Sequence, residues 1–346
     1  MGVLLWEAVA LPSARFPSCH CSVMLELDNR DLLVGFYAGS GEARPDAAWV
    51  IARKSLGDSE FGPLLTVADS IAKPEGNGIL FQDKAGRVGV VYNTMHGRLE
   101  GPHGPGVRWP TCDLRMKTST DRGRIWSDVQ MIDGRWGHVP RCKPIRMPSE
   151  NLIFGTEYPD GHSKFLVSED DGSNWRVVGS ILGEKNQHPA LMVRRDGSVL
   201  ALLRPSGSQG CVLQSESHDG GETWSDAVPT ELASPFAALD AVKLADGRFA
   251  VAWNSNPDGR NPLTLALSED EGRTWPIRRD LVTGQGSFHY PAMIQGLDGI
   301  LHVSFTNNRE TIDHIALEAR WIEGYGEALP AWDGSEKDRR ARRIRR

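Results

Sequence analysis

The sequence has few cysteines and no long hydrophobic run. Its 346 residues include five cysteines, an odd number spread thinly along the chain, which does not make a disulfide framework. No stretch approaches the roughly 18 consecutive apolar residues of a membrane-spanning helix. The first twelve residues lack the basic start of a signal peptide, and Glu7 interrupts their apolar run. We therefore expect a reduced, cytoplasmic protein that does not associate with a membrane.

The chain also lacks an excess of positive charge. Lys and Arg number 39 against 45 Asp and Glu, a formal net charge of −6. Six of the arginines lie in the last eight residues, so the remaining chain is more acidic still. An acidic body gives no electrostatic reason to bind nucleic acid, and we expect no such partner. We expect one domain over residues 1–325 and a charged, disordered tail over residues 326–346.

A repeat with a period of about fifty residues dominates the sequence. The pattern is Ser-x-Asp-x-Gly-x-x-Trp, and it occurs at 119–126, 168–175, 217–224 and 268–275. Successive tryptophans are 49, 49 and 51 residues apart, a regularity that indicates a repeat architecture. Such an octet predicts a tight hairpin, because the Asp can cap backbone N–H groups, the Gly supplies a positive φ and the Trp packs back. We interpret these Asp residues as structural.

Each period also contains two apolar segments joined by a short turn. An Asp-Gly turn at 196–197, for example, separates the apolar segments 189–193 and 198–203. About four strands per fifty residues is typical of a propeller blade, so we predict an all-β, six-bladed β-propeller. The octets close blades two to five, a degenerate octet near 55–61 closes blade one, and residues 291–322 form blade six. Residues 3–11 could supply the strand that closes the ring.

Superposing the six repeats gives two sets of polar residues at equivalent positions. The residues before the first strand of each blade are His20, Asn77, Lys143, His188, Asp240 and Tyr290. Those that end the second strand are Tyr37, Asn93, Glu157, Arg204, Asn254 and Thr306. Strand ends meet water and are polar for that reason alone, but so many titratable groups favour a concave site at the centre of the ring. Asn77, Asp240 and the neighbouring Gln187 are candidate sugar-binding residues.

The repeat resembles the sialidase (neuraminidase) superfamily, whose octets are also called Asp boxes or BNR repeats. The similarity covers most of residues 16–322, and several segments look like the sialidase-like BNR-repeat branch. These segments are Ser18-Cys19-His20, Asn186-Gln187-His188-Pro189, Leu239-Asp240-Ala241-Val242 and Tyr290-Pro291-Ala292. The resemblance implies an exo-acting, retaining glycosidase that removes sialic acid or a related terminal acidic sugar. We expect no cofactor and no metal.

The resemblance also implies roles for single residues. Tyr290 occupies the position of the nucleophile, a neutral phenol that the substrate carboxylate would not repel. Glu157 is the candidate base that polarises this phenol, and Asp46 is the candidate acid. The alternative for Tyr290 is an aromatic rim residue that stacks on sugar, and Asp46 could merely cap a turn.

Three arginines are candidates to hold the substrate carboxylate by bidentate pairing: Arg204, Arg260 and Arg309. Sialidases place their first such arginine in blade one, where this chain has Cys19-His20-Cys21. A histidine cannot form the same two-pronged contact, and Lys143 is a further candidate cation. We interpret the two cysteines as small apolar residues rather than metal ligands.

The same residues leave two other functions open. A uronate lyase needs a base at C5, an acid at the leaving oxygen and a cation for the uronate. His20 or His188 could act with Tyr290, and Arg204 or Lys143 could neutralise the carboxylate. A non-catalytic carbohydrate-binding propeller would retain the octets without needing acid, base and cation together.

Overall fold

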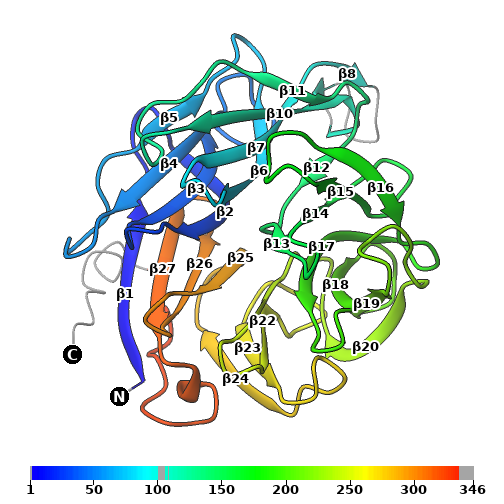
Figure 1. Cartoon of the computed structure of the whole chain (residues 1–346). Coiled ribbons are helices and arrows are strands. Elements are labelled where there is room, and N and C mark those ends of the chain that lie inside the picture. The colour runs from blue at the N-terminus through cyan, green and yellow to red at the C-terminus, as the bar shows by residue number, and fades with distance from the viewer. Residues whose placement is uncertain (1, 100–105, 108, 335–346) are drawn as a thin grey trace.

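The computed structural model describes residues 2–99, 106–107 and 109–334. Antiparallel sheets follow one another around a central axis as six blades (Figure 1). The predicted all-β, six-bladed propeller is therefore confirmed. Two short 3-10 helices, η1 (Trp109–Thr111) and η2 (Ala319–Trp321), accompany the strands. None of the helices in the described part of the chain is long and apolar enough to span a membrane.

In each of the first three blades the strands follow one another from the axis outwards. Blade one contains β2 (Ser18–Glu26), β3 (Leu32–Gly39), β4 (Ala48–Lys54) and β5 (Leu65–Ala68). Blade two contains β6 (Glu75–Gln82), β7 (Val88–Met95), β10 (Cys112–Ser119) and β11 (Gln130–Asp133). Blade three contains β12 (Val139–Pro140) and β13 (Ile145–Arg146), then β14 (Leu152–Glu157), β15 (Lys164–Ser168) and β16 (Arg176–Ser180). The small hairpin β8 (Arg98–Leu99) and β9 (Gly106–Val107) projects from blade two.

The other three blades complete the ring. Blade four contains β17 (Asn186–Val193), β18 (Val199–Pro205), β19 (Cys211–Ser217) and β20 (Val228–Ala233). Blade five contains β21 (Asp240–Lys243), β22 (Phe249–Asn254), β23 (Leu263–Ser268) and β24 (Ile277–Val282). Blade six contains β25 (Phe288–Gln295), β26 (Leu301–Asn307), β27 (Thr311–Leu317) and β1 (Val3–Ala10).

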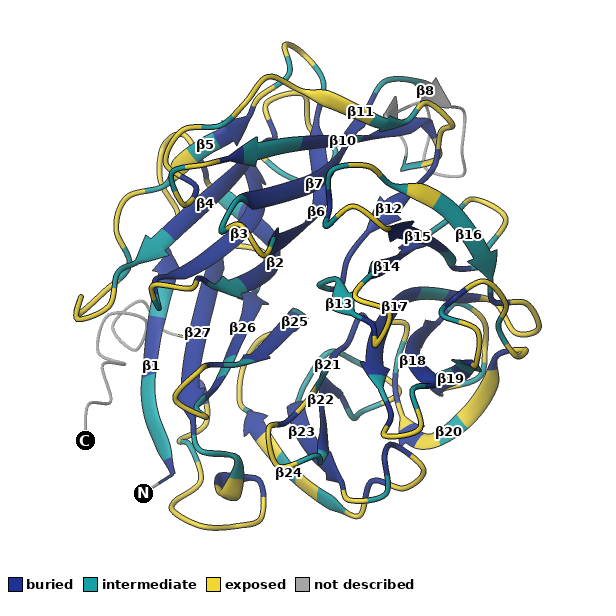
Figure 2. Ribbon diagram, in the orientation of Figure 1, coloured by how far each residue is buried: buried dark blue, intermediate teal, exposed yellow. Residues whose placement is uncertain are grey.

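The core lies between neighbouring blades, where the inner strands are covered on both faces. Every residue of β18 is buried, whereas β20, the outermost strand of the same blade, is mostly exposed (Figure 2). Strands covered on both faces are apolar throughout rather than alternating, which explains the continuous apolar runs of the sequence. The polar residues that end these strands are therefore confined to the two mouths of the ring.

The Asp boxes form the turns between the third and fourth strands of blades two to five. In the last box the Ser268 hydroxyl donates to Asp270 at 2.8 Å, and the Gly272 amide donates to the Ser268 oxygen at 2.8 Å. The Thr274 amide donates to the same Asp270 carboxylate at 2.8 Å. The other three boxes repeat the Ser–Asp and Gly–Ser hydrogen bonds. These carboxylates hold turns together, as their interpretation as structural residues requires.

The first strand of the chain closes the ring. β1 is the outer strand of blade six, where it pairs antiparallel with β27 (Figure 1). The closing strand suggested by residues 3–11 is thus confirmed. Beyond residue 325, Trp332 is buried and stacks on Trp6 of β1 with ring centres 6.4 Å apart. Its backbone also bonds to Thr283 and Gln285, so this part of the expected tail packs on the domain. Residues 335–346 of that tail lie outside the described residues.

Candidate active site

Four innermost strands carry a β-bulge near their first residues, at the same mouth of the ring: β2, β6, β17 and β25. The bulges of β2, β17 and β25 share a backbone feature. Each holds one residue with a left-handed backbone: Cys21 (φ 61°), His188 (φ 52°) and Tyr290 (φ 50°). Bulges re-aim side chains, and strained non-glycine residues persist where the surrounding structure holds them in place. Backbone strain is therefore concentrated at this mouth, where it directs polar side chains.

Tyr290 is the centre of the polar cluster at this mouth. Its hydroxyl accepts a hydrogen bond from Arg204 Nη1 at 3.2 Å. The imidazole of His20 meets its ring edge to face, with ring centres 4.7 Å apart. Arg260 Cζ lies 5.7 Å from the centre of the same ring. Blades one, four, five and six therefore converge on one phenol, as the superposition of repeats predicted for His20, Arg204 and Tyr290.

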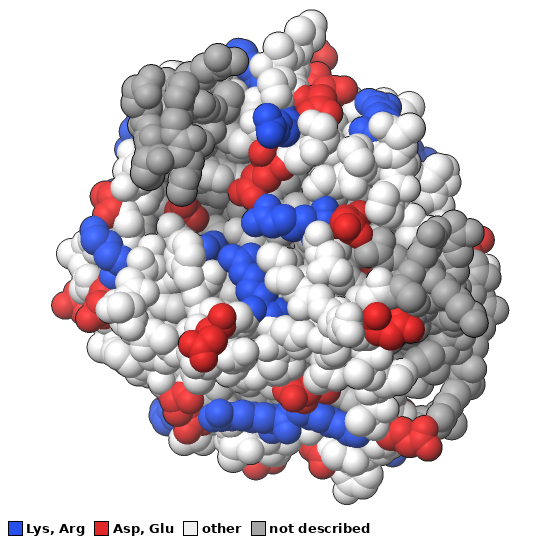
Figure 3. All heavy atoms as spheres, turned by 180° about the vertical axis from the view of Figure 1, so that it is seen from behind, with Lys and Arg blue, Asp and Glu red and all other residues white. Residues whose placement is uncertain are grey.

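Two of the three predicted arginines are braced by the same exposed aromatic residue. Arg204 lies over the ring of Phe236, with Cζ 3.5 Å from its centre, and Arg260 donates to the Phe236 carbonyl at 3.0 Å. Arg260 also contacts His289 Nδ1 at 2.5 Å. Lys and Arg side chains, with Asp and Glu side chains beside them, gather around the hollow at the middle of the ring seen from behind (Figure 3). The arrangement favours an anionic ligand.

Arg309 and Asp46 are positioned by the loops of blade six and blade one. Arg309 forms an ion pair with Glu42 from the loop after β3. Asp46 lies in the same loop, where its carboxylate accepts hydrogen bonds from the Ser40 amide at 2.9 Å and the Ser40 hydroxyl at 2.7 Å. Burial raises the pKa of Asp46, but these hydrogen bonds outweigh it and leave the pKa below its usual value. Asp46 is thus a turn cap that is ionised at neutral pH.

Glu157, His188 and Arg204 form a chain of contacts that ends at Tyr290. The Glu157 carboxylate lies 2.9 Å from His188 Nε2, and His188 Nδ1 lies 3.5 Å from Arg204 Nη1. Burial raises the pKa of Glu157, but hydrogen bonding to His188 outweighs it, so the pKa is lowered. The direct Glu157–Tyr290 pair expected from the resemblance is replaced by this indirect connection.

The histidines of the mouth are held in their neutral form. Burial lowers the pKa of His188 to about 4 and that of His289 to about 3, where the Arg260 charge adds to the effect. Burial, followed by the charge of Arg309, lowers the pKa of His20 well below its usual value. Both ring nitrogens of His20 are buried without a hydrogen-bond partner in the described structure. A neutral imidazole beside Tyr290 can accept a proton.

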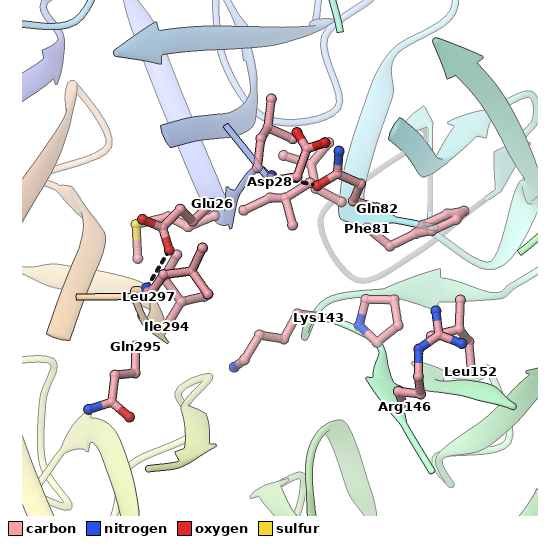
Figure 4. Close-up of a pocket in the computed structure, with 15 residues that line it drawn as sticks. Glu26, Asp28, Phe81, Gln82, Lys143, Arg146, Leu152, Ile294, Gln295 and Leu297 are labelled. Carbon is pink, nitrogen blue, oxygen red and sulfur yellow. Dashed lines mark hydrogen bonds between the residues drawn. The ribbon is translucent and has the colours of Figure 1, made fainter. Parts of the chain in front are cut away.

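Lys143 and Asp240 lie deeper in the ring than predicted and bind each other. Lys143 Nζ is 2.9 Å from Asp240 Oδ1, and Asp240 Oδ2 accepts a hydrogen bond from the Met293 amide at 2.8 Å. Lys143 also lines a cavity of about 460 Å³ at the opposite mouth, together with Glu26 and Gln295 (Figure 4). The structure does not bring this pair to Tyr290. We place the site at Tyr290 because the strained backbone, neutral histidines and converging arginines are found there.

Asn77 and Gln187 both lie on innermost strands at the Tyr290 mouth. Asn77 is buried within the bulge of β6, and Gln187 pairs with Arg204 across β17 and β18. The Gln187 side-chain oxygen is buried without a hydrogen-bond partner in the described structure. Among the residues described, no group of three or more His, Cys, Asp or Glu is placed to hold a metal ion.

Comparison with known proteins places this geometry in a family. Residues 30–303, most of the chain, match the BNR repeat-like domain. The chain belongs to this family. The BNR repeats are the four Asp boxes and the blades that they close, so the predicted membership of a sialidase-like BNR-repeat family is confirmed.

Individual relatives of this BNR-repeat protein are named as sialidases. Over 224 residues it is 26% identical to the anhydrosialidase of Macrobdella decora, covering 55% of this chain and 29% of that protein. Over 170 residues it is 27% identical to a Micromonospora viridifaciens sialidase, covering 46% and 26%. The chain thus spans less than a third of the length of these curated relatives.

Solved structures share the fold at low identity. The leech intramolecular trans-sialidase, complexed with 2,7-anhydro-Neu5Ac, superposes with a TM-score of 0.77 at 14% identity, covering 92% of this chain and 71% of that one. A Dyadobacter fermentans protein of unknown function superposes with a TM-score of 0.76 at 14% identity, covering 91% and 98%. Identities this low establish the propeller alone.

One residue of the BNR-repeat mouth was missed by the sequence reasoning. Arg141 is completely buried, and its Cζ lies 5.3 Å from the centre of the Tyr290 ring. It stands in the segment that separates β12 from β13, two residues before Lys143. The superposition selected Lys143 by its distance from Glu157, and no pattern in the sequence distinguishes the two cations.

Proposed function

We propose that this protein is an exo-acting glycosidase that removes a terminal acidic sugar, sialic acid or a related one. The observation that carries the proposal is the convergence of Arg204 and Arg260 on Tyr290. Planar guanidinium groups suit a carboxylate because they can pair with both of its oxygens. The named sialidase relatives and the shared propeller support the same class of substrate.

In the proposed mechanism the Tyr290 oxygen attacks the anomeric carbon while the bond from that carbon to the leaving oxygen breaks. The phenol proton passes to a neutral imidazole, for which His20 and His188 are the neighbours. A water molecule protonates the leaving oxygen, and a second water then displaces Tyr290 with retention of configuration, while the Tyr290 oxygen recovers its proton from the imidazolium. Ionised Asp46 is better suited to activating that water than to donating the first proton, because its hydrogen bonds favour the carboxylate.

The test is release of fluorophore from aryl α-glycosides of sialic acid and of related acidic sugars. We expect release with wild-type protein and a loss of at least about a hundredfold in kcat for Tyr290→Phe, which removes the oxygen but retains the ring. A 2,3-difluorinated substrate should leave a sugar adduct on the Tyr290 peptide, detectable by mass spectrometry. Full activity of Tyr290→Phe would rule out the nucleophile.

A second candidate is elimination at a uronate, which the unpaired ring nitrogens of His20 favour. His20 would take the C5 proton, the C4–oxygen bond would break, a C4–C5 double bond would form, and Tyr290 would protonate the leaving oxygen. Incubation with uronate-containing oligosaccharides separates the two reactions, since elimination produces an ultraviolet-absorbing unsaturated uronate and hydrolysis does not. Sugar binding without either product would indicate the non-catalytic alternative.

A further inference from the structure

Arg141 is a buried cation that the proposed mechanism does not use. Its side chain has no accessible surface, and no acidic group lies within ion-pair distance of it in the described part of the chain. Nη2 donates to the Pro291 carbonyl at 2.6 Å, whereas Nε and Nη1 have no hydrogen-bond partner among the described residues. A buried charge destabilises a fold unless neighbouring groups pair with it or accept hydrogen bonds from it.

Burial lowers the pKa of Arg141, but the groups around it, Asp240 and Tyr290 among them, outweigh burial and leave the pKa raised although none of them forms an ion pair with it. Burial raises the pKa of the Cys21 thiol to about 12 and also raises that of Cys142, so both thiols are neutral. The Asp240 carboxylate is held by Lys143 and by two backbone amides. The guanidinium therefore acts on the aromatic ring beside it and on the carbonyl that it binds.

Both contacts of Arg141 reach the same short segment of β25. Pro291, whose carbonyl it binds, directly follows Tyr290, whose backbone is held at a φ of 50°. The guanidinium carbon lies 5.3 Å from the Tyr290 ring centre. Tyr290 has no carboxylate in contact with it among the described residues, because Glu157 is bound to His188.

We propose that Arg141 is a positioning residue that holds Tyr290 in its strained, site-facing conformation and places a fixed positive charge beside its ring. Burial raises the pKa of Tyr290, and the charges of Arg204 and Arg260 oppose that rise. The charge of Arg141 favours the phenolate in the same direction, so neighbouring cations rather than a carboxylate base limit the cost of forming it. The inference rests on Tyr290 being the reacting group of the proposed function. Arg141 itself is too deeply buried to touch a substrate.

Fluorine NMR of protein labelled with 3-fluorotyrosine tests this inference without any substrate. The chain has five tyrosines, so Tyr290→Phe identifies the Tyr290 resonance by its disappearance. A unit charge about 5 Å away shifts a titration by about one to two pH units at the effective dielectric of a protein interior. We therefore expect the Tyr290 titration midpoint to rise by that amount in Arg141→Met and to change little in Arg141→Lys, which retains the charge.

Arg279→Met is the control, because Arg279 also donates to backbone carbonyls and lies over an aromatic ring, but far from the mouth. Arg279 donates to the Trp321 carbonyl at 2.7 Å, and its Cζ lies 4.1 Å from the Trp321 ring centre. This control should lower the melting temperature and leave the Tyr290 midpoint unchanged. If Arg141→Met does not fold, Arg141→Gln takes its place.

Three outcomes are possible. A raised midpoint in Arg141→Met, with kcat reduced at unchanged KM on an active substrate, supports the positioning role. A midpoint equal to wild type overturns it. A raised midpoint in a protein that cleaves no acidic-sugar glycoside would contradict the proposed function and leave the effect of Arg141 on Tyr290 established.

Discussion

Arg204 contacts three different side chains at the mouth. It donates to the Tyr290 hydroxyl, lies over Phe236 and approaches His188. A planar guanidinium can stack on an aromatic ring and present its N–H groups sideways at the same time, whereas the ammonium of lysine cannot. Arg204 therefore connects Phe236, His188 and the Tyr290 hydroxyl.

Arg204→Lys should consequently weaken recognition of the carboxylate although the charge is retained. We expect KM for an acidic-sugar glycoside to rise at least about tenfold, with a much smaller change for the corresponding methyl ester. Arg278→Lys is the matched control, because Arg278 pairs with Glu231 at the outer rim of blade five. Equal effects on the acid and its ester would show that Arg204 does not bind the carboxylate.

At the scale of elements, the Asp-box glycine has two separate reasons to be glycine. Gly272 has a φ of 87°, and a Cβ built there would lie 2.3 Å from Leu200 Cδ2 of the neighbouring blade. Gly247, in an Asp-Gly turn, has a φ of 90° but nothing within 4 Å of the added carbon. The Asp box is thus a contact between blades as well as a turn.

This pair of glycines separates backbone strain from overpacking. Gly247→Ala should cost about 1 kcal/mol of unfolding free energy through its positive φ alone. Gly272→Ala should cost about 1–3 kcal/mol more, because the methyl group displaces Leu200 from a packed interface. Urea unfolding of both variants measures the difference, and equal losses would contradict the role of the box in joining blades.

The same scale explains how far the sequence could predict the structure. The blades were predictable because each octet and each Asp-Gly turn is local chemistry that forms the same hairpin in every repeat. The site was predictable in blades one, four and six, where a shared bulge keeps His20, His188 and Tyr290 at one mouth. Lys143 and Asp240 were misplaced because their spacing to the second strand is two residues shorter, which puts both deeper along the axis.

Arg141 and the Glu157–His188 contact could not have been predicted from the repeat. Blade three splits its innermost strand into β12 and β13, and Arg141 lies in the interruption, outside any strand register. The pairing of Glu157 with His188 depends on the angle between two blades, which a one-dimensional superposition does not contain. Both features are contacts between repeats, whereas the sequence pattern describes the inside of each repeat.

At the scale of the whole molecule, a cluster of ionisable groups joins the N-terminal strand to blades one and six. Glu7 of β1 accepts Lys54 of blade one at 2.6 Å and lies 3.1 Å from His314 of blade six. His302 lies 2.9 Å from His314, and their rings stack. Asp298, in the turn before β26, also acts on His302. The N-terminal strand is thus fixed to the two blades that it joins.

This cluster should make the closed ring sensitive to acid. Burial, with the His314 charge, lowers the pKa of His302 to about 3, and burial also lowers that of His314. Burial raises the pKa of Glu7, but its hydrogen bonds to His314 and Lys54 outweigh it, so the pKa is lowered. The histidine pKa in the unfolded chain is about 6.5. Below that pH the unfolded chain binds protons that the folded chain does not bind, so the free energy of unfolding falls as pH falls.

The loss amounts to about 1.4 kcal/mol per pH unit for each such histidine, fully developed below about pH 6, and Glu7 adds to it below about pH 4.5. His302→Gln, which retains a hydrogen-bonding side chain but cannot titrate, should therefore have a shallower decline of unfolding free energy between pH 6.5 and pH 5. The exposed His218, changed to Gln, is the matched control and should retain the wild-type slope. Urea unfolding across this range measures the dependence of unfolding free energy on pH for wild type and both variants. A slope for His302→Gln as steep as that of wild type would show that His302 does not contribute to the acid sensitivity between pH 6.5 and pH 5.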